Sequence, residues 1–141
     1  MTETSVVPTI SASDEQAIRT LVQQASDAQN DPDVLIPLHT RDAIIVNFFG
    51  RRVLGRDAFE QAMRAALSSP LRDVATDVEI IDLRPVTDSV VLVSCIKTVR
   101  DMREDRSAAE LPGSVGALTY VARRIDNEWK IALAQTTPIG T

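Results

Sequence analysis

The side chains suited to acid–base catalysis are few in this sequence. His39 is the only histidine, and a pKa near neutrality would suit a general base. Asp42 lies three residues later and would serve as an isomerase base if burial raised its pKa. Each also has a structural interpretation, His39 as a packed core residue and Asp42 as a cap or as a partner of Arg41 or Arg56. The structural interpretation is favoured for both, so no catalytic residue is assigned.

Other reactive groupings find little support in the residue types. Cys95 is the only cysteine, and its place in a continuous apolar strand favours an inert core thiol. One histidine and one cysteine preclude a histidine-rich or multi-cysteine metal site. The sequence holds no glycine-rich phosphate loop and no recognisable Ser/His/Asp set. We therefore expect neither a metal nor a cofactor.

The last hairpin supplies the candidate binding residues. Asp126-Asn127 predicts a two-residue turn, which places Ile125 opposite Glu128. Because side chains alternate along a strand, the remaining pairs follow from this register. The face expected to lie under the helices holds Leu118, Tyr120, Ala122, Arg124, Trp129, Ile131, Leu133 and Gln135.

From that face we predict a ligand-binding set. Gln135 is the leading polar candidate, because a buried amide must find a hydrogen-bond partner in a ligand, a water or the backbone. Tyr120 has a hydroxyl to place in the cavity, and Leu133 adds apolar wall. Trp129 could form a wall or simply pack in the core with Arg124 stacked on it. Asn47, from an earlier strand, would reach a ligand carbonyl only if it points inward.

Helices come first along the chain, and strands follow. Apolar residues at three- and four-residue steps predict a helix over 13–30, capped by Ser13 with Gln16 in a capping box. Asp31-Pro32 begins a second, short helix, and a third covers 57–68. Strands are expected over 43–49, 51–54, 74–83, 90–99, 116–125 and 128–137. This order predicts an α+β fold with the three helices on the concave face of a curved antiparallel or mixed sheet.

Bulk composition narrows the class. The 141 residues suffice for one domain over 12–139 after a flexible polar tail over 1–11. The net charge of −5 and the presence of only two lysines disfavour nucleic-acid binding. No apolar run is long enough to span a membrane, and no export signal is recognisable, so we expect a cytoplasmic protein. The charged stretch 101–115, interrupted by Pro112-Gly113, is either a surface loop or a flap over the pocket mouth.

The opposite face of the last hairpin carries small and apolar residues with little charge. It is expected to hold Arg123, Val121, Thr119 and Ala117 with Lys130, Ala132, Ala134 and Thr136. Such a face either remains a solvated sheet surface or packs against a second copy of the chain. The second interpretation predicts a homodimer formed through the sheet.

Several short motifs, in this order, resemble a known family. They are Ser26 to Asp31, Leu38 to Ala43, Gly55 to Phe59, Arg123 to Ile131 and Thr137-Pro138. Over residues 12–139 the chain resembles the SnoaL-like branch of the nuclear transport factor 2 superfamily. More narrowly, it is similar to the SgcJ/EcaC family, which is associated with enediyne antibiotic biosynthesis.

The resemblance implies a cone-shaped, cystatin-like domain, a homodimer and a ligand pocket, but not one reaction. The catalytic carboxylate–arginine groupings of the enzymes in this superfamily have no matching position here. Two hypotheses follow. The protein binds an apolar polyketide-derived or enediyne intermediate and catalyses its cyclisation or isomerisation, or it is a non-catalytic binding or accessory protein for a reactive metabolite.

Overall fold

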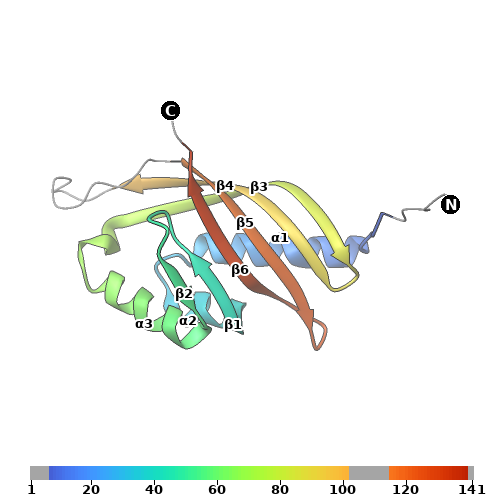
Figure 1. Ribbon diagram of the computed structural model, residues 1–141, viewed down its shortest axis with the longest axis horizontal. Coiled ribbons are helices and arrows are strands. Elements are labelled where there is room, and N and C mark those ends of the chain that lie inside the picture. Colours follow the sequence, from blue (N-terminus) through green and yellow to red (C-terminus); the bar gives the residue numbers. More distant parts are fainter. Residues whose placement is uncertain (1–6, 102–114, 140–141) are drawn as a thin grey trace.

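A six-stranded mixed sheet curves around three α-helices in the computed structural model, which describes residues 7–101 and 115–139 (Figure 1). The strand order is β2-β1-β6-β5-β4-β3, with β1 parallel to β6 and the other neighbours antiparallel. The strands are β1 His39–Val46, β2 Arg52–Leu54, β3 Val74–Thr87, β4 Val90–Asp101, β5 Val115–Ile125 and β6 Glu128–Pro138. The helices are α1 Ala12–Asp27, α2 Pro32–Leu35 and α3 Arg56–Leu67. This is the cystatin-like α+β fold that the sequence predicts.

Helix α1 lies lengthwise against the long strands and supplies much of the core (Figure 1). Its buried stripe follows the predicted spacing, with Ile18, Leu21, Val22 and Ala25 buried. Its cap differs from the prediction. Ser11, rather than Ser13, accepts a hydrogen bond from the Asp14 backbone N–H at 3.0 Å. The helix therefore begins at Ala12, and the predicted capping box is not formed.

The short elements after α1 turn the chain back toward the sheet. Asp31 precedes α2 and Pro32 takes the first helical position, as predicted. A 3₁₀ turn, Ile36–Leu38, accommodates Pro37 and leads directly into β1. Strand β1 therefore begins at His39, before the predicted position 43. Gly55 precedes α3 with a φ of 96°, a left-handed conformation that favours glycine.

The outer strand β3 is longer than predicted. It continues through Pro85 to Thr87 and leaves only Asp88-Ser89 as the turn into β4. Proline is tolerated there because β3 is an edge strand, whose free side needs no backbone donor. Most of the stretch 101–115 lies outside the described residues. Within the described residues, no helix is long and apolar enough to cross a membrane.

The last hairpin confirms the predicted turn but only part of the predicted register. Asp126 and Asn127 both have positive φ, and the pairs from Ile125–Glu128 to Ala122–Ile131 form as expected. Beyond Ile131 the register shifts, and Val121 pairs with Leu133 while Tyr120 pairs with Ala134. Ala132 is thus the extra residue of a β-bulge. The predicted pairs of Tyr120 with Leu133 and of Leu118 with Gln135 are wrong.

Candidate functional site

A cavity of about 490 Å³ lies between the C-terminal end of α1, helix α3 and the inner face of the sheet. Side chains from α1, α3, β1, β4, β5 and β6 line it. The apolar lining includes Ala25, Leu35, Ile45, Val53, Phe59, Met63, Ala66, Leu71, Leu118 and Ala134. We call this end of the molecule the open end. In Figure 1 it lies near α3 and the β1–β2 hairpin.

A second chamber of about 250 Å³ adjoins the first. Both chambers are lined by Gln29, Asn47, Phe49, Met63, Ala66, Leu71 and Lys97. The second adds Phe48 and residues from the paired ends of β3 and β4, namely Val74, Thr76 and Val99. The two chambers therefore share part of their wall, and apolar side chains outnumber the polar ones in each; we call the two together the hollow.

Tyr120 lines the main chamber, as predicted. It lies on the inner face of β5 and is 4% exposed. Burial raises the pKa of its phenol, so the hydroxyl stays protonated and able to donate a hydrogen bond at ordinary pH. Thr136, on β6, contributes a second hydroxyl-bearing side chain to the same chamber. The bulge at Ala132 brings Thr136 to this face.

Three of the predicted binding residues lie elsewhere. Gln135 is exposed, because the bulge moves it to the outer face. Leu133 moves with it, and neither residue lines the hollow. Trp129 is buried on the inner face, but it lies toward the other end of α1 and is hydrogen-bonded there. None of these three residues lines this cavity, and Trp129 packs in the core beside Arg124, which is the second of its two interpretations.

Asn47 lies at the cavity mouth with its carbonyl oxygen already engaged. Its Oδ1 accepts hydrogen bonds from the backbone N–H groups of Phe49 and Arg51, each at 3.0 Å. These bonds shape the turn between β1 and β2. Asn47 lines both chambers, as expected if its side chain points inward. Its hydrogen bonds, however, stabilise the turn.

His39 is 3% exposed and is held in place by its neighbours. Its Nδ1–H donates to the carbonyl oxygen of Leu35 at 2.9 Å, and its ring meets Phe59 edge-on at 4.8 Å between centroids. Burial lowers the His39 pKa to about 4, against the raising effect of the backbone hydrogen bonds. The neutral ring is positioned by packing, in agreement with the structural interpretation.

Asp42 cannot supply the buried base considered from the sequence. Its carboxylate is exposed and accepts a hydrogen bond from the Thr40 hydroxyl at 2.8 Å. That bond lowers the Asp42 pKa, with a further contribution from Arg123 at 3.8 Å, whereas a general base of this kind needs a raised pKa. The ion-pair partner is Arg123 rather than Arg41 or Arg56.

Lys97 is a cavity residue that the sequence interpretation missed. It lies on the inner face of β4 and lines both chambers. Burial lowers the Lys97 pKa to about 8. The sequence contains a pattern that could have identified it. Every second residue of the predicted strand shares a face, namely Val91, Val93, Cys95 and Lys97, so a buried Cys95 implies that Lys97 points inward.

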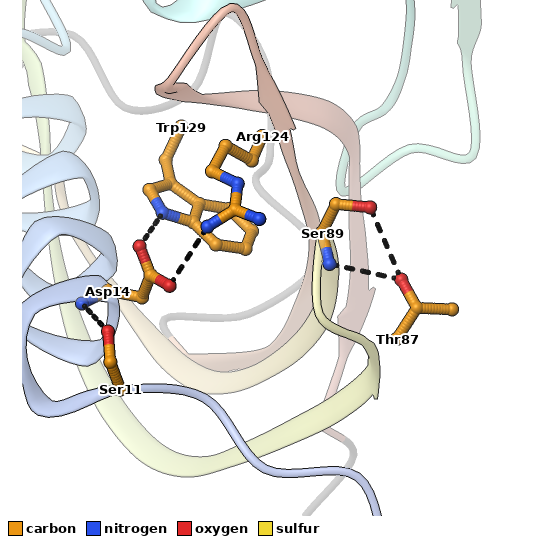
Figure 2. Close-up of polar contacts among 6 residues, drawn as sticks. All are labelled: Ser11, Asp14, Thr87, Ser89, Arg124 and Trp129. Atoms are coloured by element: carbon orange, nitrogen blue, oxygen red, sulfur yellow. Dashed lines mark hydrogen bonds and ion pairs between the residues drawn. The ribbon is translucent and has the colours of Figure 1, made fainter.

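The opposite end of α1, which we call the closed end, is held by a cluster of paired polar groups. Asp14 accepts hydrogen bonds from the Trp129 indole N–H and from Arg124, each at 3.1 Å (Figure 2). The Arg124 guanidinium also lies 5.8 Å from the centre of the Trp129 ring, as the predicted stacking requires. The Trp129 hydrogen bond is the main cause of the lowered Asp14 pKa.

The β3–β4 turn is joined to this cluster through the backbone of Arg124. The Arg124 N–H donates to the Ser89 carbonyl at 2.9 Å. Within the turn, the Thr87 hydroxyl accepts from the Ser89 N–H at 3.1 Å (Figure 2). Helix α1, the β3–β4 turn and the last hairpin are thereby joined at one point. Among residues 7–101 and 115–139, no cluster of three or more His, Cys, Asp and Glu residues is arranged to hold a metal.

Comparison with known proteins gives a family match and several similar folds. The model of the family described as SnoaL-like domain matches residues 18–136. A protein of unknown function with a cystatin-like fold from Nostoc punctiforme is 21% identical, with a TM-score of 0.76 over 93% of this chain and 80% of that chain. A nuclear transport factor 2-like protein of unknown function from Shewanella oneidensis is 13% identical, with a TM-score of 0.72 over 89% and 99%.

A third similar structure has an activity in its name. It is a protein provisionally named a scytalone dehydratase, from Novosphingobium aromaticivorans. It is 17% identical, with a TM-score of 0.70 over 88% of this chain and 83% of that chain. At these identities the likeness concerns the fold. No curated protein matches the sequence.

Proposed function

This chain belongs to the SnoaL-like domain family, and on that premise we propose that its cavity binds one predominantly apolar small molecule. The observation that carries the proposal is the hollow itself. A volume of about 490 Å³ lies within the range of small-molecule sites, roughly 300–1,000 Å³. The lining is apolar apart from a few groups, as expected of a site that holds a ligand by burial and orients it by a few polar contacts.

The proposed role is in natural-product biosynthesis. The motif order that resembles the SgcJ/EcaC family supports a polyketide-derived or enediyne-type intermediate as the ligand. Cyclisation or isomerisation is the catalytic form of the proposal. Its support is the buried Tyr120 phenol, which can donate a hydrogen bond to a ligand carbonyl.

The alternative is a non-catalytic binding or accessory protein for a reactive metabolite. Its support is that no Asp or Glu belongs to the described lining of either chamber. His39 has one ring nitrogen committed to Leu35, and Asp42 faces solvent. Product analysis with a bound intermediate separates the two forms, since only the catalytic form changes the ligand.

Binding can be tested with Nile red, whose fluorescence rises in apolar surroundings, and with a matched pair of helix variants. Ala66 lines the cavity, whereas the adjacent Ala65 of α3 is exposed. We expect Ala66→Trp to fill the hollow and abolish dye binding, with Ala65→Trp binding as the wild type does. Equal dye binding by wild type and both variants would show that the cavity is not the site.

We also propose that the protein forms a homodimer through the sheet and works in the cytoplasm. Partly exposed apolar residues on the outer face, including Leu92 and Val121, support the dimer. Sedimentation velocity tests it: Val121→Glu should yield monomers if two outer faces pack together. A wild-type monomer at micromolar concentration would refute this interface. The cytoplasmic proposal rests on the sequence features alone.

A further inference from the structure

Lys97 occupies the junction of the two chambers. It pairs with Val78 on β3 and with Gly116 on β5, and its side chain is partly buried on the inner face. Because it lines both chambers, its amine-bearing side chain forms part of the wall around a ligand in either one. The remaining titratable or charged groups of the described lining are Arg51, His39 and Tyr120.

An aromatic ring supports the lysine on one side. The Lys97 Nζ lies 5.7 Å from the centre of the Phe48 ring. Gly116 makes this arrangement possible, because a Cβ there would lie 2.8 Å from both the Phe48 ring and the Thr136 methyl. Because Gly116 has no side chain, the Phe48 ring has room to lie beneath the amine. Gly116, which lies opposite Lys97 in the sheet, therefore helps to position it.

The second lysine of the chain, Lys130, has the polar partners that Lys97 lacks. Lys130 donates a hydrogen bond to the Pro37 carbonyl at 2.7 Å and lies 3.5 Å from the Glu128 carboxylate. Within the part of the chain that the structure describes, Lys97 has no carboxylate within ion-pair distance and no hydrogen-bond acceptor. The Phe48 ring is the neighbour that attracts a charged Lys97, and it is a weaker partner than a carboxylate, so the loss of water still favours the neutral amine. This agrees with a Lys97 pKa near 8.

A second polar group in the same chamber is also unpartnered. The Oγ1 of Thr76 is buried and has no hydrogen-bond partner among the described residues. Thr76 pairs with Val99 on β4, which makes it the diagonal neighbour of Lys97 on the inner face. A hydroxyl and an amine that both lack hydrogen-bond partners and line one chamber, whose other polar side chains are the amides of Gln29, Asn30 and Asn47, favour a ligand with a polar group at this point.

We propose that Lys97 is a nucleophilic amine that forms an imine with the aldehyde or ketone group of an apolar ligand held in this cavity. The inference rests on the proposed function, since it requires that the cavity bind small molecules. It adds the chemical class of the ligand and the atom that reacts with it.

The reaction balances without a further reactant. The Nζ lone pair attacks the carbonyl carbon and forms a carbinolamine, in which the former carbonyl oxygen is a hydroxyl. The C–O bond then breaks, and the oxygen leaves as water with both protons that the neutral amine carried. A C=N bond remains, and hydrolysis reverses the sequence. The lining carries the hydroxyl groups of Thr76, Thr136 and the protonated Tyr120, and Thr76, the diagonal neighbour of Lys97, is the one that we assign to donate to the departing oxygen.

An ionic ligand fits this site less well. A ligand carboxylate paired with a Lys97 ammonium would place two charges in a hollow lined mainly by apolar side chains, where desolvation opposes their attraction. An imine removes the amine from solvent and leaves no charge behind. Desolvated lysines in apolar pockets are activated for this addition.

The test uses the whole protein and the apolar aldehyde 4-isopropylbenzaldehyde with sodium cyanoborohydride, which reduces an imine to a stable secondary amine. The chain has only two lysines and one terminal amine, so peptide mapping assigns every label. We expect Lys97 to be labelled at least about tenfold faster than Lys130 at pH 8, because burial favours the neutral Lys97 amine, whereas the Lys130 amine is held by the Pro37 carbonyl and the Glu128 carboxylate. Its labelling rate should rise with pH and level off above about 8.

Two variants and two analogues make the outcome decisive. Lys97→Arg should lose the fast label, and Ala66→Trp should slow it to the rate of Lys130. 4-Isopropylbenzyl alcohol, which cannot form an imine, should still displace Nile red. Displacement by the alcohol without preferential labelling of Lys97 would overturn the imine and leave the proposed function standing.

Tighter displacement by 4-isopropylbenzoate than by the aldehyde, again without a Lys97 label, would replace the imine with an ion pair. Absence of dye binding to the wild type would overturn the proposed function together with the inference. Fast labelling of Lys97 in Ala66→Trp would show that the amine is reactive without the cavity, which contradicts the proposal.

Discussion

The polar groups near the two ends of helix α1 differ in whether they have hydrogen-bond partners. At the closed end, Asp14, Arg124 and Trp129 satisfy one another at hydrogen-bond distance. At the open end, Lys97 and Thr76 lack partners within the described residues and face a hollow. Asp14 and Ala25, which mark the two ends, lie about 16 Å apart along the helix axis. The same helix is thus fastened by paired groups at one end and borders unpaired ones at the other.

The difference indicates where stability and function reside. Paired polar groups favour one arrangement of the fold, while unpaired buried groups cost free energy that a bound ligand or water can return. Functional sites commonly keep such local defects, because a site complementary to a ligand is incomplete without it. The following variants should separate the two ends by the sign and size of their effects.

The largest effect is expected from the fully buried part of the sheet. Ile131 is 0% exposed, and Ile131→Ala should lower the free energy of unfolding by about 3–4 kcal/mol through lost burial and a residual void. Leu71 lines the hollow and is 38% exposed, so Leu71→Ala should cost less than about 1 kcal/mol. Urea denaturation measures both losses. Equal losses would contradict the distinction between a tightly packed core at Ile131 and a hollow at Leu71.

His39 should make stability depend on pH. Its folded pKa of about 4 lies below the ordinary value of 6.5, so the unfolded chain binds more protons between these values. Stability should therefore rise with pH from 4 to 6.5, by roughly 3 kcal/mol at most. His39→Gln should lack this component in denaturation curves across that window. An unchanged pH profile in the variant would show that His39 is not held neutral.

Lys97→Met should act in the opposite direction from the core variants and stabilise the protein. The folded pKa of about 8 lies below 10.5, so a charged Lys97 is a native-state penalty at pH 7. Allowing for its partial exposure, we expect a gain of about 1–2 kcal/mol. The gain should shrink as pH rises from 8 through 10.5. A loss of stability at pH 7 would indicate that Lys97 has a partner.

Trp129→Phe should cause the smallest change in the free energy of unfolding, and its effect should be limited to the closed end. The change keeps an aromatic ring but removes the indole N–H that Asp14 accepts. A net loss of about 1 kcal/mol is expected, with Nile red binding unchanged. Weakened dye binding in this variant would mean that the two ends are coupled.

Much of the fold could be predicted, because it depends on local patterns. Apolar spacing located α1 and α3, Asp31-Pro32 located α2, and Asp126-Asn127 fixed the last turn. The inner face of β6 could not be predicted beyond Ile131. A bulge adds one residue without a distinctive sequence signal, and one residue moves every later side chain to the other face. Gln135 and Leu133 were misplaced for that reason.

The candidate site was only partly accessible from sequence. The bulge lies in β6 and leaves the alternation of β5 intact, so Tyr120 is on the predicted face although its partner is Ala134 rather than Leu133. Lys97 was overlooked because a charged residue in a β-branched strand is ordinarily assigned to the solvent face, whereas here the alternation from Val91 through Cys95 takes it inward. Its lack of a partner is a property of three-dimensional packing, which residue spacing does not reveal.

The central claim is that the open end is built to hold a ligand, and native mass spectrometry tests it most directly. Wild type, Ala66→Trp and Ala65→Trp would be purified from the cells that produce the protein. We predict a reproducible small-molecule mass on wild type and Ala65→Trp that is missing from Ala66→Trp. The same mass on all three, or on none of them, would contradict the claim.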